Sequence, residues 1–232
     1  MNRKTYEFDI VAFDCDSTLS AVEGIDLLAQ RHGIKREVEE ITHKAMNGHG
    51  SFAEALALRL DLVRPTREDL AWLGSEYVRH ALPGVKEVIS DLRDLNRRVY
   101  VVSGGFRGAI NILAGEIGID RECILANDLL FDEDGAYLGF DQNNPMSQNQ
   151  GKVKVLRELS NTGRVLFVGD GATDLEAKEV VDLFVGFGGI CVREKVKQMA
   201  DIFIEEPSLR KIVKLTTGKN REMRVKYQLA QL

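Results

Sequence analysis

Two aspartates lie two positions apart directly after an apolar run near the beginning of the chain. The run is Phe8–Phe13, and the next five residues read Asp-Cys-Asp-Ser-Thr. A turn after a buried strand can present two carboxylates at the sheet edge where open α/β folds bind their ligands. Two such carboxylates can divide the work of catalysis, one as nucleophile and the other as acid and base. The alternative is an ordinary turn, since Asp and Ser are frequent turn residues.

A second pair of aspartates follows another apolar run, in the sequence Gly-Asp-Gly-Ala-Thr-Asp at positions 169–174. The glycines allow a tight turn, so that Asp170 and Asp174 face back toward the edge at which Asp14 is expected. Mg²⁺ prefers carboxylate oxygens and keeps several waters, and the spacing therefore predicts a magnesium site. The alternative is a plain strand-to-helix turn in which Asp174 caps the next helix.

An anion site is indicated by Ser103, Gly104 and Gly105, which follow a third apolar run. A hydroxyl group and unobstructed backbone N–H groups at a helix N-terminus bind anions. Lys152 begins a further helical segment directly after Gly151 and supplies the positive charge that a phosphate among aspartates needs. The alternatives are a serine that caps a helix, loop glycines and a solvated lysine.

Four short runs of β-branched and apolar residues are expected to position these motifs. Each run ends at a small or acidic residue, as a buried parallel strand does at the C-terminal edge of its sheet. Apolar residues over 85–95 and 106–117 recur with the helical spacing of three and four positions. Strands that alternate with helices predict an α/β fold with a doubly wound, Rossmann-like parallel sheet. The four runs are Phe8–Phe13, Val99–Val102, Cys123–Ala126 and Val165–Val168.

Two segments interrupt this alternation. Residues 21–80 contain no convincing strand and are interpreted as about four helices inserted after the first strand. The breaks between these helices are expected near Gly33, Gly48-His49-Gly50 and Pro65. Leu129–Phe131 and Tyr137–Phe140 flank an Asp-Gly turn, which predicts a small β-hairpin insert. The expected division is a core domain of residues 1–20 and 81–218, a helical insert of residues 21–80 and a C-terminal tail of residues 219–232.

Composition excludes several classes of protein. The 232 residues are 44% hydrophobic and 29% charged, which is typical of a folded globular chain. A net charge of −5, with no basic block before the tail, argues against nucleic acid as a partner. The longest uncharged apolar stretch, near Leu183–Val192, is too short to span a membrane, and the first residues lack the pattern of a secretory signal.

Cysteine and histidine usage excludes further classes of protein. The 3 cysteines include no close pair, which favours a reducing, cytoplasmic compartment over a disulfide framework or a zinc site. The 4 histidines show no metal-binding spacing, and no serine-hydrolase motif is present. A histidine metal site and a Ser-His-Asp triad therefore have little support in the sequence.

The motifs occur in a fixed order along the chain: the Asp-Cys-Asp-Ser-Thr turn, then Ser-Gly-Gly, Gly-Lys and Gly-Asp-Gly-Ala-Thr-Asp. With this order the sequence resembles the haloacid dehalogenase (HAD) superfamily of phosphohydrolases and, within it, the family of phosphoserine phosphatases. The likeness runs from about Ile10 to Leu209. It also rests on Glu23–Asp26, Ala45-Met46, Phe52, Leu58–Leu60, Pro83-Gly84, Ser103–Arg107, Leu138–Asp141 and Val185–Gly189.

The resemblance implies Mg²⁺-dependent hydrolysis of O-phosphoserine to serine and phosphate, the final step of serine biosynthesis. It implies that Asp14 is phosphorylated during the reaction and that Asp16 is the general acid and base. Mg²⁺ is then expected to bind Asp14, the Asp16 carbonyl group and Asp170, with Asp174 in support. A closed site and the neighbouring Asp14 carboxylate are expected to raise the pKa of Asp16, so that it is neutral when substrate binds.

The resemblance also implies that residues 21–80 form a cap over the site. In that cap Glu23 and Arg59 are expected to recognise the ammonium and carboxylate groups of serine, and the planar fork of Arg suits a carboxylate. The substrate-binding residues implied in addition are Met46, Phe52, Ser103, Gly104, Gly105, Lys152 and Thr173.

Two departures from the family pattern and two alternative functions remain open. Asn47 stands where relatives usually carry glycine, and the tail after about Thr216 is not covered. The enzyme could instead transfer phosphate to an acceptor such as homoserine, or hydrolyse another small phosphomonoester. A receiver-like signalling module also uses Mg²⁺ and an aspartate that is phosphorylated. Against that module stand Asp16, two residues after the acceptor, and the helical insert. The oligomeric state is left open, a homodimer included.

Overall fold

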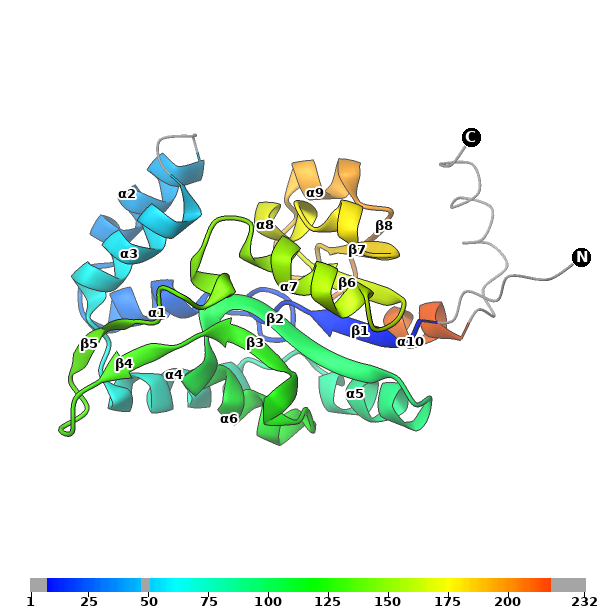
Figure 1. Cartoon of the computed structure of the whole chain (residues 1–232), viewed down its shortest axis with the longest axis horizontal. Helices are drawn as coiled ribbons and strands as arrows, with labels where there is room; N and C mark the ends of the chain where they lie inside the picture. The colour runs from blue at the N-terminus through cyan, green and yellow to red at the C-terminus, as the bar shows by residue number, and fades with distance from the viewer. Residues whose placement is uncertain (1–7, 47–50, 218–232) are drawn as a thin grey trace, which may run out of the picture.

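The computed structural model of the protein describes residues 8–46 and 51–217, and its centre is a six-stranded parallel sheet (Figure 1). The strand order is β3-β2-β1-β6-β7-β8, so β1 lies in the middle of the sheet between β2 and β6. The predicted α/β fold is confirmed. The strands are β1 (Ile10–Phe13), β2 (Arg98–Phe106), β3 (Ile124–Asn127), β6 (Val165–Gly169), β7 (Leu183–Phe187) and β8 (Ile202–Ile204).

All four predicted strands are present, but the sequence interpretation missed β7 and β8. The apolar stretch that contains β7 carries three glycines, which lower the strand propensity of a sequence. One of them, Gly186, lies where a Cβ would be 2.7 Å from the Phe203 ring on β8. Glycine inside a strand commonly marks such a close approach. β8 has only three residues, too few for a periodic pattern to be recognised.

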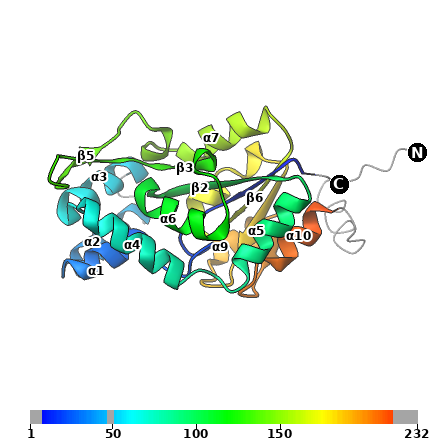
Figure 2. The same cartoon turned by 90° about the horizontal axis from the view of Figure 1, so that it is seen from below.

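Helices cover both faces of the sheet (Figure 2). Side chains alternate along β1, so Val11 and Phe13 join one apolar cluster and Ile10 and Ala12 join the other. The first cluster is completed by α5 (Val85–Asp94), α6 (Arg107–Ile117) and α10 (Arg210–Thr216). The second is completed by α7 (Gly151–Ser160), α8 (Ala172–Leu175) and α9 (Glu194–Met199). A central strand buried on both faces cannot shift easily, which gives the residue after β1 a fixed position.

Four helices follow β1, as predicted for the insert. They are α1 (Gly24–Arg31), α2 (Lys35–Met46), α3 (Phe52–Val63) and α4 (Arg67–Arg79). Gly33 separates α1 from α2 with a positive φ of 73°, and Ser51 and Thr66 begin α3 and α4 with capping boxes. Asp69 of α4 is buried and contacts Arg31 at 2.9 Å and His32 at 3.0 Å, which ties α4 to the end of α1. The division of the chain into core and cap stays a prediction.

The expected hairpin is present as β4 (Leu129–Phe131) and β5 (Tyr137–Phe140), with Gly135 at a positive φ of 86° in the turn. This hairpin is bonded to the insert. The Arg67 amide donates to the Gly135 carbonyl group at 2.9 Å, and the Arg67 guanidinium donates to the Asp132 carbonyl group at 3.2 Å. Arg64 donates to the Tyr137 carbonyl group at 3.1 Å. The insert therefore has a second attachment besides the packing of α4 on α6.

Three short 3-10 helices complete the described chain: η1 (Arg121–Cys123), η2 (Pro145–Ser147) and η3 (Lys178–Val180). Within residues 8–46 and 51–217 no helix combines the length and the apolar character needed to cross a bilayer. The residues 1–7, the break expected near residues 48–50, Asn47 and the tail of residues 219–232 lie outside the described residues, as does the side chain of Met46.

The aromatic pair across β6 and β7 gives the first testable prediction. Phe184 is fully buried, and its ring lies 5.9 Å from that of Phe167. Phe184→Ala should lower the free energy of unfolding by about 3–5 kcal/mol, because it removes apolar contacts and leaves a cavity. Urea denaturation measures this. Met199→Ala is the control, since Met199 is 50% exposed and its loss should cost well under 1 kcal/mol. If both variants lowered the free energy of unfolding equally, the residues around Phe184 would have to fill the space left by the ring at no cost in stability.

Candidate active site

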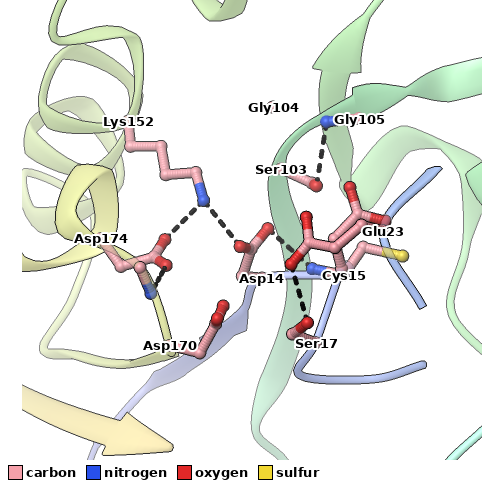
Figure 3. Close-up of polar contacts among 12 residues, drawn as sticks. Asp14, Cys15, Ser17, Glu23, Ser103, Gly104, Gly105, Lys152, Asp170 and Asp174 are labelled. Atoms are coloured by element: carbon pink, nitrogen blue, oxygen red, sulfur yellow. Dashed lines mark hydrogen bonds and ion pairs between the residues drawn. The ribbon is translucent and has the colours of Figure 1, made fainter. Parts of the chain in front are cut away.

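The C-terminal ends of β1, β2 and β6 bring the sequence motifs together. Asp14 directly follows β1, and its amide donates to the Val168 carbonyl group of β6 at 2.9 Å. Asp170 follows β6, and Ser103 lies near the end of β2. Figure 3 shows these side chains facing one another. The strand order thus joins residues that are about 160 positions apart in the sequence.

A buried ion-pair network occupies the centre of the site. The Lys152 ammonium lies 2.8 Å from Asp14 Oδ2 and 2.5 Å from Asp174 Oδ1 (Figure 3). Lys152, Asp14 and Asp174 are all buried. The backbone amide of Cys15 donates to the other oxygen of Asp14 at 2.7 Å. A buried charge requires a partner of opposite sign, and the lysine serves both carboxylates.

The carboxylates in the site repel one another. Burial and the Asp14 charge raise the pKa of Asp174 to about 8, although Lys152 lowers it. Burial and the Asp14 charge also raise the pKa of Asp170 to about 6. Burial alone would lower the pKa of Lys152, but Asp14 and Asp174 outweigh that effect and hold it above its ordinary value. One lysine therefore does not neutralise the cluster, which favours binding of a further cation.

The turn at residues 169–174 depends on glycine. A Cβ on Gly169 would lie 2.3 Å from Asp174 Cγ, so no larger residue fits there. The Gly171 amide donates to Asp174 Oδ2 at 2.9 Å, and Asp174 thereby caps α8. The capping alternative is therefore correct for this residue, yet the same carboxylate also contacts Lys152. Capping and membership of the charged cluster occur together.

The Ser103–Gly105 segment lies inside β2, not after it. The pairing of β2 with β3 is irregular between Val102 and Phe106, so the segment bulges from the ladder. Asn127 at the end of β3 donates to the Gly104 carbonyl group at 2.7 Å, and the Gly105 amide donates to Ser103 Oγ at 3.1 Å. The interpretation of Ser103 as a helix cap is wrong, because α6 begins after Phe106. The bulge places Gly104 in the pocket that Lys152 also lines and Gly105 beside Asp16.

Asp16 lies on the side of the site nearer the insert. Its Oδ1 accepts hydrogen bonds from the Tyr77 hydroxyl group at 2.6 Å and the Gly24 amide at 3.1 Å. Burial, with the charges of Glu23 and Asp14, raises the pKa of Asp16 well above its ordinary value. Burial also raises the pKa of Tyr77, so the phenol keeps its proton. A raised pKa favours the acid form of Asp16, which is the form that a general acid requires.

Glu23 and Arg193 connect the insert to the turn after β6. Glu23 Oε1 accepts a hydrogen bond from Ser17 at 2.7 Å and contacts an Arg193 guanidinium nitrogen at 3.2 Å. The Arg193 Nε donates to Asp170 Oδ2 at 2.8 Å. Burial raises the pKa of Glu23, although Ser17 and Arg193 lower it in part. Arg193 is thus a second cation among the carboxylates.

A pocket beside the charged cluster contains further predicted residues. Phe52, Gly104, Lys152 and Thr173 line it, and a Cβ on Gly104 would lie 3.4 Å from the Phe52 ring. Arg59 is half-buried and donates from Nε to the carbonyl group of Ala55 on its own helix at 3.1 Å. Its guanidinium is in the electrostatic field of Asp26, Glu23 and Asp16. The remaining lining residues are Met146, Gln148, Gln150, Gly151 and Glu176.

Sequence reasoning missed three residues of this site: Tyr77, Arg193 and Asn127. Tyr77 occupies a position of α4 that periodicity assigns to the apolar core, and nothing local predicts its contact with Asp16. Arg193 follows the glycine-rich stretch at the end of β7, and neither its residue type nor its spacing from the aspartates indicates a role in the site. Asn127 directly follows the predicted third strand, and a polar residue at that place was a usable signal.

Asp14, Asp170 and Asp174 each offer an oxygen, and these oxygens lie within 4.8 Å of one another. Such hard oxygen donors in a buried cluster fit a divalent cation of the Mg²⁺ type. A carboxylate nucleophile, a second carboxylate in its acid form, and cations and amides around one pocket can together transfer a phosphoryl group.

Comparisons with known proteins agree with this geometry. The family profile of haloacid dehalogenase-like hydrolases matches residues 8–182. The human phosphoserine phosphatase is 40% identical over 204 residues, which cover 87% of this chain and 91% of that protein. The chloroplastic phosphoserine phosphatase of Arabidopsis thaliana is 43% identical over 202 residues, covering 84% of this chain and 68% of that protein. The crystal structure of a phosphoserine phosphohydrolase-like protein from Francisella tularensis has a TM-score of 0.78 at 26% identity, covering 89% and 99% of the two chains.

The lysine at the centre of the cluster yields a stability prediction. Lys152→Gln leaves Asp14 and Asp174 buried without their shared cation, so without divalent ions the free energy of unfolding should fall by about 3–5 kcal/mol. Protonation removes the charge of a buried carboxylate that has no partner. The loss of stability in Lys152→Gln should therefore be smaller at pH 5 than at pH 8. Urea denaturation at both pH values tests this. Lys154→Gln, on the exposed side of the same helix, is the control, and equal losses in the two variants would contradict the prediction.

Proposed function

This chain belongs to the haloacid dehalogenase-like hydrolases and, within them, to the phosphoserine phosphatase family, and we propose that it hydrolyses O-phosphoserine to serine and phosphate through a phosphorylated aspartate. This reaction is the final step of serine biosynthesis. The observation that carries the proposal is the buried pair of Asp14 and Lys152 at 2.8 Å, with Asp16 held beside it.

Asp14 is the proposed nucleophile. The Cys15 amide and Lys152 hold its two oxygens, so the carboxylate cannot rotate freely. Its attack on phosphorus forms an O–P bond while the bond from phosphorus to the serine oxygen breaks, and water later hydrolyses the acyl phosphate. Division into two steps means that water displaces a carboxylate, which is a better leaving group than the serine alkoxide.

Asp16 is the proposed general acid and base. It donates a proton to the leaving serine oxygen in the first step and accepts one from the attacking water in the second. Its raised pKa, caused by burial and by Glu23 and Asp14, supports the acid form before the reaction. The proton taken from water restores that form at the end of the cycle.

Mg²⁺ is the proposed cofactor, and the donors proposed for it are Asp14, Asp170 and the backbone carbonyl group of Asp16. When bound, it supplies positive charge that reduces repulsion between the nucleophile and the phosphate. Asp174 fits a supporting role, because Lys152 and the Gly171 amide already engage its two oxygens.

The phosphate group is proposed to bind between Lys152 and the bulge of β2. Lys152, Ser103 and the amides of Gly104 and Gly105 can donate to its oxygens, and such preorganised donors stabilise charge that develops in the transition state. Thr173, which lines the same pocket as Lys152, adds a hydroxyl group.

The serine part of the substrate is proposed to bind under the insert, with residues 21–80 as its cap. Phe52 lines the pocket together with Gly104, which supports closure of α3 over the phosphate site. Glu23 would bind the ammonium group and Arg59 the carboxylate group, and Met46 would add apolar contact. Arg59 interacts electrostatically with Glu23, which supports the placement of both residues around one small zwitterionic group.

Phosphate release from a panel of phosphomonoesters, with and without Mg²⁺, tests the function. Wild-type protein should prefer O-phosphoserine and lose activity without the ion. Asp14→Asn should abolish release, because the amide keeps the shape of the side chain but is not a competent nucleophile. Circular dichroism should show an intact fold. Near wild-type turnover in this variant would refute the phosphoaspartyl route.

Substrate recognition gives a separate prediction. Arg59→Ala leaves the substrate carboxylate unpaired, and a lost hydrogen bond to a charged group costs about 1.5–3 kcal/mol. The kcat/KM for O-phosphoserine should therefore fall roughly 10- to 100-fold. Hydrolysis of para-nitrophenyl phosphate, which has no carboxylate group, should hardly change. Arg36→Ala on the exposed face of α2 is the control, and equal losses on both substrates would give Arg59 a structural role only.

A further inference from the structure

Tyr77 is a fully buried tyrosine whose hydroxyl group reaches a carboxyl group 61 positions earlier in the chain. Its side chain extends from α4 to the turn after β1 and donates to Asp16 Oδ1 at 2.6 Å. The roles proposed above are filled without it, so this buried polar contact has no function assigned to it.

Two glycines leave the space that the Tyr77 hydroxyl group occupies. A Cβ on Gly24 would lie 2.2 Å from the Tyr77 oxygen, and a Cβ on Gly105 would lie 3.3 Å from it. The hydroxyl group is thus enclosed by two glycine backbones, one at the start of α1 and one in the bulge of β2. Two small residues on separate elements leave room for one phenol.

The hydrogen bonds to Asp16 make its two oxygens different. Oδ1 accepts from both the Tyr77 hydroxyl group and the Gly24 amide, so its lone pairs are engaged by the protein. A Cβ on Gly105 would lie 3.2 Å from Oδ2, so Oδ2 is the oxygen beside the segment proposed to bind phosphate. Rotation of the carboxyl group would break both bonds to Oδ1.

We propose that Tyr77 is a positioning residue for the acid and base Asp16, holding Oδ1 so that Oδ2 faces the leaving oxygen of the substrate. This inference rests on the proposed function. In the first step the proton moves from Oδ2 to the serine oxygen as the bond from that oxygen to phosphorus breaks and Asp14 bonds to phosphorus. In the second, a water proton moves to Oδ2 while the water oxygen displaces Asp14.

Leaving groups of different basicity separate this role from simple support of the fold. The serine oxygen leaves as a strongly basic alkoxide and needs a proton, whereas para-nitrophenolate leaves without one. A misplaced Asp16 should therefore slow transfer from an alkyl phosphate and spare transfer from an aryl phosphate. The phosphorylation step is the one to measure, because breakdown of the phosphoenzyme uses Asp16 with either substrate.

The experiment compares Tyr77→Phe with wild-type protein loaded with Mg²⁺. Single-turnover release of serine from O-phosphoserine should slow about ten-fold or more, with little change in KM. The rate of the para-nitrophenolate burst from para-nitrophenyl phosphate should stay within about two-fold of wild type. Tyr137→Phe, which removes a phenol hydroxyl group from a buried tyrosine of the hairpin, is the matched control and should change neither rate.

Equal slowing of both rates, or no change in either, would overturn the role of Tyr77. Failure of wild-type protein to release serine would overturn the proposed substrate instead. The rates for Tyr77→Phe and wild-type protein would then be measured with β-glycerophosphate in place of O-phosphoserine. Slower release of glycerol with an unchanged para-nitrophenolate burst would support the role of Tyr77, and any other result would overturn it.

Discussion

Repulsion among buried carboxylates is the constraint around which the site is built. Asp14, Asp16, Glu23, Asp170 and Asp174 gather at one edge of the sheet, and Lys152 and Arg193 are the cations that contact them. Each of these cations bridges two carboxylates instead of pairing with one. The raised pKa values of Asp16 and Asp174 reflect the repulsion that remains, and hydrogen bonds from amide and hydroxyl groups offset part of it.

The parallel sheet makes this concentration of charge tolerable. β1 is covered by helices on both faces and paired on both edges, so its end is held from four sides. The amide of Asp14 continues the ladder to β6, and glycine at position 169 lets Asp174 approach the backbone closely. Apolar packing distant from the site therefore supplies the rigidity that the carboxylates need.

Much of this arrangement could be predicted from the sequence, because its elements are local. Each apolar run and each helical period reports on neighbouring residues, and parallel strands place their ends at one edge, so Asp14 and Asp170 could be assigned to the same edge in advance. The contacts of Tyr77 and Arg193 could not be predicted. Each of these residues joins two segments that are far apart in the sequence, and their distance in space depends on how the insert and the last strands pack. β7 could not be predicted for a related reason: Gly186 within it and Gly188 directly after it lie close to the Phe203 ring, which only the folded chain brings near.

The bonds between the hairpin and the insert have a consequence for how such a molecule could open. Arg64 and Arg67, at the junction of α3 and α4, are held to the hairpin by main-chain acceptors, and α4 also packs on α6. A rigid swing of all four helices would break these bonds together and would expose the packed face of α4. Displacement confined to α2 and the first turns of α3 leaves them intact. The junction of α3 and α4 is therefore fixed to the hairpin, and a rearrangement of the insert that keeps these hydrogen bonds leaves the start of α4 in place.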